Sequence, residues 1–64
     1  SRRDFARFLD ISLGSAGELG LFLEISLDLG YINTNEFKKA DALLTEVKKL
    51  LYSFRRSLKG DPKS

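Results

Sequence analysis

The side chains that carry most enzyme chemistry are missing from this chain of 64 residues. It contains no His and no Cys, which removes the commonest general base, the thiol nucleophile, the ordinary zinc site and the disulfide. Glu24 and Asp28 lie one helical turn apart, but carboxylate metal sites in helical bundles also require Glu-x-x-His elements. A solvated acidic strip explains these two residues better. We therefore expect no enzymatic activity, no cofactor and no metal.

A second candidate is a cluster of small residues in which Gly14, Gly17 and Gly20 interrupt a helical pattern. Its spacing matches neither the dinucleotide-binding fingerprint nor the P-loop. Each glycine inside a helix costs about 1 kcal/mol relative to alanine, so something should offset the loss. The favoured explanation is close approach of a neighbouring helix, with Ser hydroxyls bonded to the preceding turn. The alternative is a helix break at Gly14, with a restart capped by Ser15 and Glu18.

Residues in and around this cluster are predicted to have packing roles. Glu18 lies at the edge of the apolar side of the helix, where a carboxylate requires an Arg, Lys or hydroxyl partner. Two helices alone do not guarantee such a partner. The predicted packing and structural residues are Gly14, Ser15, Glu18, Leu19 and Gly30.

A third candidate is a basic stripe near the C-terminal end. Its residues share one sector of a helical wheel, and they combine cationic with aromatic side chains, as a surface contacting a nucleic-acid backbone does. A solvated face is the favoured reading, because cations near a helix C-terminus complement its dipole and their stems cover apolar neighbours. Contact with RNA or DNA is the alternative. The stripe comprises Lys48, Tyr52, Arg55, Arg56 and Lys59.

The first half of the chain predicts one long helix, over about 2–29. Ser1 and Asp4 have the spacing of a capping box, and Gly30 can adopt the left-handed conformation after the last turn. Small and apolar residues recur at helical spacing. The predicted central stripe is Phe5, Phe8, Ser12, Ala16, Leu19, Phe22, Leu23 and Ser26. It is flanked on one side by Leu9, Leu13 and Leu27, and on the other by Ile11, Ile25 and Leu29.

After a turn at 30–33, a second helix is predicted over about 34–59, followed by a polar tail at 60–64. Asn33 and Glu36 form another capping box, and Ile32 can pack on Phe37 across the first turn. Gly60 and Pro62 end the helix, because neither residue favours its continuation. The predicted apolar seam is Phe37, Ala40, Leu44, Val47, Leu51, Phe54 and Leu58.

Two helices of matched length joined by a short turn predict an antiparallel hairpin. The apolar arc of the first helix covers more than half of its circumference, whereas one neighbouring helix covers only a narrow seam. We therefore expect an all-α fold in which this hairpin forms half of an up-and-down four-helix bundle and is oligomeric. Because position 1 is Ser rather than Met, we also expect that an upstream segment has been removed. The missing helices would come from that segment or from other copies of the chain.

Charge and hydropathy set the expected environment. The formal net charge is only +2, yet residues 1–31 carry three Arg against five acids, and residues 32–64 carry eight Lys and Arg against four acids. No apolar run approaches the length of a membrane span, and Arg2-Arg3 is not followed by a signal-peptide core. These features predict a soluble cytoplasmic protein that does not contact a membrane.

Two motifs carry a resemblance to a known family: Gly14-Ser15-x-x-Glu18-Leu19 and Leu29-Gly30-Tyr31-Ile32. Together with Ser1-Arg2-Arg3-Asp4-Phe5 and Phe8-Leu9-x-Ile11-Ser12-Leu13, they resemble the second half of the bacterial four helix bundle protein family. That family is also called the 23S rRNA intervening-sequence protein, or S23, group. The similarity continues through Phe37, Leu51 and Ser57-Leu58-Lys59 to the end of the chain. Gly17 and Gly20 depart from the family pattern, which has larger residues there.

The resemblance implies a full-length protein of about twice this length, with two further helices ahead of Ser1. It also implies ring-like homopentamers without enzymatic activity. Some members are encoded within rRNA intervening sequences, and a similar bundle is the accessory protein of diversity-generating retroelements, where it binds nucleic acid and a reverse transcriptase. The expected function is therefore a non-enzymatic structural or interaction protein. A nucleic-acid-binding accessory protein is the alternative.

Overall fold

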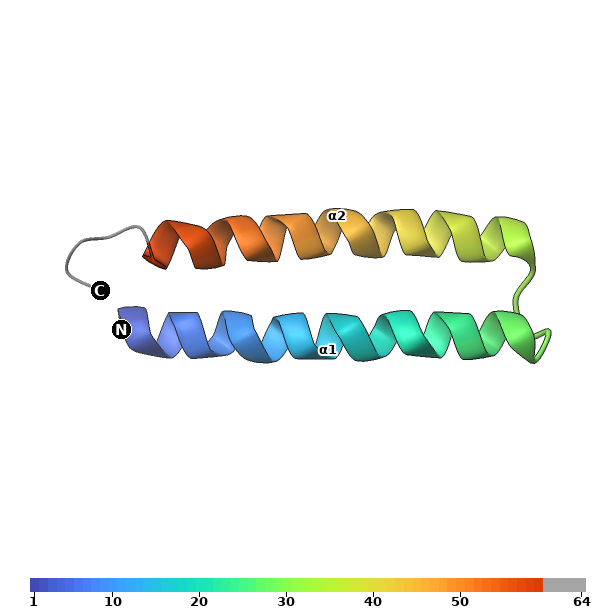
Figure 1. The fold of residues 1–64 in the computed structure, drawn as a ribbon, viewed down its shortest axis with the longest axis horizontal. Helices are drawn as coiled ribbons and strands as arrows, with labels where there is room; N and C mark the ends of the chain where they lie inside the picture. The colour runs from blue at the N-terminus through green and yellow to red at the C-terminus, as the bar shows by residue number, and fades with distance from the viewer. Residues whose placement is uncertain (60–64) are drawn as a thin grey trace.

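Two long antiparallel helices make up the fold (Figure 1). The computed structural model describes residues 1–59, with only the backbone of Lys59, and contains helix α1 at Arg2–Asp28 and helix α2 at Thr34–Lys59. This confirms the predicted all-α helical hairpin. The predicted stop at Gly60 and Pro62 and the polar tail at 60–64 lie outside the described residues.

Each helix begins with the predicted capping side chain. The backbone N–H of Asp4 donates to Ser1 Oγ at 3.3 Å, and the Asp4 carboxylate lies 3.7 Å from the Ser1 amino group. At α2 the exchange is reciprocal: the N–H of Glu36 donates to Asn33 Oδ1 at 2.7 Å, and the N–H of Asn33 donates to Glu36 Oε1 at 2.9 Å. These bonds satisfy N–H groups that the first turn of a helix leaves without a partner.

The turn between the helices depends on one glycine. Gly30 has φ +80°, a left-handed conformation that side chains with a Cβ rarely adopt. In this conformation the N–H of Gly30 donates to the Leu27 carbonyl at 3.1 Å, and that of Tyr31 donates to the Ser26 carbonyl at 2.9 Å. This pair of bonds is a Schellman motif, and it satisfies the last carbonyls of α1 while the chain reverses.

Helix α1 runs without interruption through its glycine cluster, so the alternative of a break at Gly14 is wrong. Ser12 Oγ donates to the Phe8 carbonyl at 2.9 Å, which confirms the predicted bond to the preceding turn. A continuous helix satisfies the backbone groups of this segment, whereas a break would leave several of them to water.

Close helix approach occurs at only one of the three glycines. A Cβ placed on Gly20 would lie 3.4 Å from Leu44 Cδ2, so α2 packs directly over this position. Gly14 and Gly17 have no atom of another element within 4 Å of the corresponding point. The hairpin therefore explains Gly20 and leaves the other two without a packing partner in the described chain.

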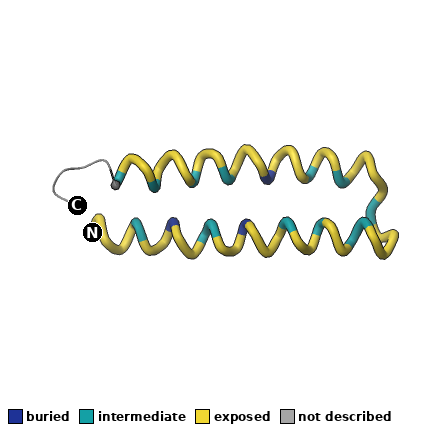
Figure 2. The backbone as a smooth tube through the Cα atoms, in the orientation of Figure 1, coloured by how far each residue is buried: buried dark blue, intermediate teal, exposed yellow. Residues whose placement is uncertain are grey.

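The contact between the helices is narrow (Figure 2). Only Leu9, Ala16 and Leu44 are buried among the described residues, and the half-buried residues follow the same inner line. α2 packs toward the Leu9 edge of the predicted apolar arc, so the predicted stripe is covered only in part: Ser12, Ala16, Leu23 and Ser26 are half-buried or buried. The arc is wide enough for two seams, and the remainder stays exposed. Exposed members of the predicted stripe are Phe5, Phe8, Leu19 and Phe22.

Helix α2 follows its predicted seam more closely. Phe37, Ala40, Leu44, Leu51 and Leu58 are half-buried or buried along α1. The other two members, Val47 and Phe54, are each 46% exposed. Both lie toward the same edge of α2, so its apolar face also extends beyond the contact with α1.

The molecule is a rod rather than a compact domain. Its radius of gyration is 14.8 Å, whereas about 11 Å is typical of a compact domain of this length. Neither described helix is long and apolar enough to cross a membrane.

Candidate interaction surfaces

An apolar groove runs between the two helices on one face of the hairpin. It contains no charged residue, and its polar members are two serines. The groove residues of α1 are Phe8, Ile11, Ser12, Ser15, Ala16, Leu19 and Leu23. Those of α2 are Ala40, Leu43, Leu44, Val47 and Leu51.

Several side chains in this groove are open to water. Leu43 is 68% exposed, Phe8 is 61% exposed and Ile11 is 60% exposed. Contiguous apolar surface without charge marks a place where another protein element packs. Two of the predicted packing residues, Ser15 and Leu19, line this groove and are exposed, so they are not part of the buried contact between α1 and α2.

The opposite flank of the hairpin is charged. Arg55 Nε donates to Asp10 Oδ1 at 2.9 Å, which links α2 to α1. On a helical wheel, Asp10 lies directly opposite Leu19, so the ion pair and the groove are on different sides of α1. Lys48 lies on the charged flank as well, since its Nζ is 3.9 Å from the point where a Cβ of Gly20 would be.

The residues of the predicted basic stripe therefore fall into two groups that differ in exposure. Lys48 and Arg55 are half-buried along α1, whereas Tyr52 and Arg56 are exposed. The Lys59 side chain is outside the described residues.

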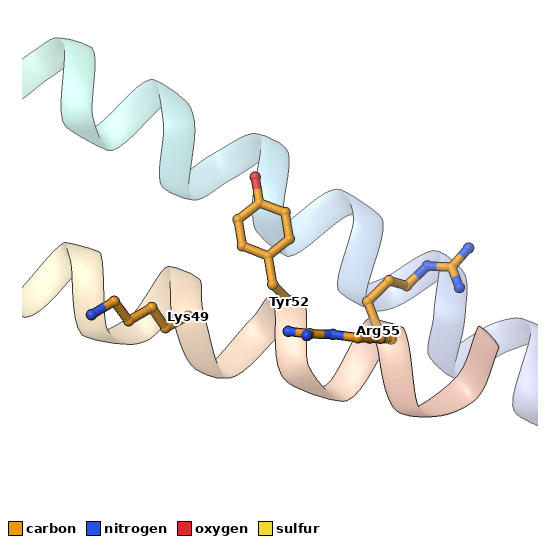
Figure 3. A pocket seen from close by; sticks show the side chains of 4 residues that line it. Lys49, Tyr52 and Arg55 are labelled. Atoms are coloured by element: carbon orange, nitrogen blue, oxygen red, sulfur yellow. The ribbon is translucent and has the colours of Figure 1, made fainter. Parts of the chain in front are cut away.

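Sequence reasoning missed Lys49, which lines a shallow hollow with Tyr52, Arg55 and Arg56 (Figure 3). Helical spacing could have identified Lys49, because this residue lies on the same face of α2 as Arg56, which follows two turns later. In the described part of the chain, the side chains of Lys49 and Arg56 form no hydrogen bond and no ion pair.

The structure also defines the surroundings of two other predicted packing residues, Glu18 and Gly30. Glu18 is exposed, and its side chain forms no hydrogen bond or ion pair with any residue that the structure describes. Gly30 has the turn conformation given above. Within residues 1–59, no group of three acidic side chains is arranged to hold a metal ion, and Glu24 and Asp28 are both exposed.

Comparison with known proteins supports the resemblance carried by the two motifs. The model of the family described as 23S rRNA-intervening sequence protein matches residues 1–53. The match ends before Ser57-Leu58-Lys59, so Arg55 and Arg56 are also outside it. No curated protein and no solved structure matches the chain. The chain belongs to the 23S rRNA-intervening sequence protein family.

Proposed function

We propose that this chain is a non-enzymatic assembly module that provides half of a four-helix bundle and forms homo-oligomers. The groove is the observation that supports this proposal most strongly, because it leaves uncharged apolar surface in water along both helices. Two further helices, from flanking chain or from another copy, would cover it. Four helices with short connections then share one apolar core.

Burial of the groove favours assembly. A large apolar side chain that passes from half-exposed to buried contributes about 1 kcal/mol. Several such side chains line the groove, including Leu43, Phe8 and Leu19. Their combined contribution is comparable to the few kcal/mol by which small domains are stable.

A charge placed in the groove tests this proposal. Leu43→Glu would bury a carboxylate in the assembled core, so we expect dissociation into smaller species or loss of cooperative unfolding. Leu43 is mostly exposed in the hairpin, so the variant leaves the contact between α1 and α2 unchanged. Ser57→Glu is the control, because Ser57 is exposed on the part of α2 that faces away from α1 and does not line the groove. Sedimentation velocity that shows the same mass for both variants and the wild type would exclude the groove as an assembly surface.

Nucleic-acid binding is the second candidate function. Its support is the exposed group of Lys49, Tyr52 and Arg56, which combines cations with an aromatic ring. A salt titration of RNA and DNA binding tests it: affinity should fall steeply with salt, and Lys49→Ala plus Arg56→Ala should reduce the slope by about 2. Lys39→Ala is a control elsewhere on α2. Absence of binding at moderate salt would remove this candidate.

A further inference from the structure

Helix α1 carries a second apolar surface, which is separate from the groove. At about 100° per residue, Ile25 lies directly opposite Ala16, the residue buried against α2. Leu21 and Leu29 lie within about 40° of Ile25, and the three side chains are 43% to 64% exposed. None of them lines the groove. We call this surface the back stripe; it comprises Gly14, Glu18, Leu21, Ile25 and Leu29.

A completed bundle would not cover the centre of the back stripe. In a four-helix bundle, each helix contacts two neighbours about a quarter of a turn apart, and its outer side faces away from the core. α2 is one neighbour of α1, and a helix in the groove would be the other. Leu21 and Ile25 would then remain exposed on the outside, together with Gly14. Apolar residues in such a position indicate contact with another protein surface.

The charges of the chain indicate which surface fits. Every charged residue of α1 after Arg7 is acidic, namely Asp10, Glu18, Glu24 and Asp28. Every charged residue of α2 after Glu46 is basic, namely Lys48, Lys49, Arg55, Arg56 and Lys59. The outer side of α2 also presents an aromatic ring that is exposed among these cations. We call this surface the basic face; it comprises Lys38, Lys49, Tyr52 and Arg56.

We infer that the back stripe of one copy docks on the basic face of another copy of this chain. Glu18 then gains the cationic partner that its own hairpin does not provide, from Lys49 or Arg56. The ring of Tyr52 packs on Leu21 and Ile25, which are exposed in the hairpin. The contact joins two different surfaces, so it is head-to-tail and uses both surfaces of every copy. This inference rests on the proposed assembly function and identifies its second interface.

Charge reversal in the natural protein, with whatever sequence flanks these 64 residues, tests the pairing. Glu18→Lys should reduce the mass measured by light scattering to that of one bundle, because like charges would meet. Lys49→Glu with Arg56→Glu should have the same effect. The three substitutions combined in one chain should restore the larger assembly. Glu46→Lys, a reversal on α2 outside both surfaces, should leave the mass unchanged.

The outcomes separate this inference from the proposed function. Unchanged mass in the Glu18→Lys protein, with Leu43→Glu still disruptive, overturns the second interface and leaves the groove as an assembly surface. Disruption by single reversals without rescue in the combined variant shows that another partner occupies the back stripe, which also overturns it. Loss of RNA retention in the Lys49→Glu, Arg56→Glu protein at unchanged mass assigns the basic face to nucleic acid and has the same consequence.

Discussion

At the scale of single residues, the reversal of the chain rests on a few local bonds. Gly30 provides the left-handed turn, and Asn33 and Glu36 satisfy each other's backbone N–H three residues later. All of these interactions connect residues at most five positions apart, which is why the sequence predicts them without knowledge of the tertiary structure. Side chains that contact the other helix are a different case, because their partners are distant in sequence.

Glycine substitutions should have opposite effects at two positions. Gly30→Ala should lower the free energy of unfolding by about 1 kcal/mol, because alanine disfavours the positive φ of the turn. Gly17→Ala should raise it by about 1 kcal/mol, because that position is helical and a new Cβ has open space. Urea denaturation of the two variants measures both changes. Equal changes of the same sign would contradict the turn conformation or the continuous helix.

The cap of α2 makes a separate prediction. Asn33→Ala removes the acceptor of the Glu36 N–H and should lower the free energy of unfolding by about 1 kcal/mol. Asn35→Ala serves as the control, since Asn35 is an exposed residue of the first turn with no side-chain hydrogen bond among the described residues. Thermal unfolding followed by circular dichroism compares them, and equal melting temperatures would show that the cap does not stabilise α2.

At the scale of elements, the sequence predicts two helices and an apolar arc wider than one partner can cover. It does not predict which edge of that arc α2 takes. Leu9 and Phe8 are both apolar and adjacent in sequence, yet one is buried and the other is exposed. The edge that α2 contacts depends on the direction in which α2 leaves the turn. The spacing of apolar residues in the sequence carries no information about that direction. For the same reason, the sequence places Arg55 in the basic stripe but does not predict its ion pair with Asp10.

That ion pair should contribute little to the hairpin. The two side chains are 33% and 57% exposed, and such pairs are typically worth under about 1 kcal/mol. A double-mutant cycle with Asp10→Asn and Arg55→Gln should therefore give a coupling free energy below about 1 kcal/mol, decreasing further as salt is added. A much larger coupling would mean that the charged flank, and not the apolar contact, holds the helices together.

At the scale of the whole molecule, the chain is mostly surface. The three residues that are buried among the described ones, along a rod with a radius of gyration of 14.8 Å, do not make a core of the size that small domains need. The small size of the hydrophobic core was predictable from the width of the apolar arc of the first helix and from the lack of cysteines for disulfides. The number of copies in the proposed assembly does not follow from these features, because helical periodicity carries no information about symmetry.

Sedimentation equilibrium of the isolated 64-residue chain, measured over a wide range of concentration, tests the central claim most directly. Uncovered apolar surface predicts a mass above that of the monomer, increasing with concentration, and helical content that is lost on dilution. A monomer that stays helical at the lowest concentration and melts cooperatively would contradict the claim.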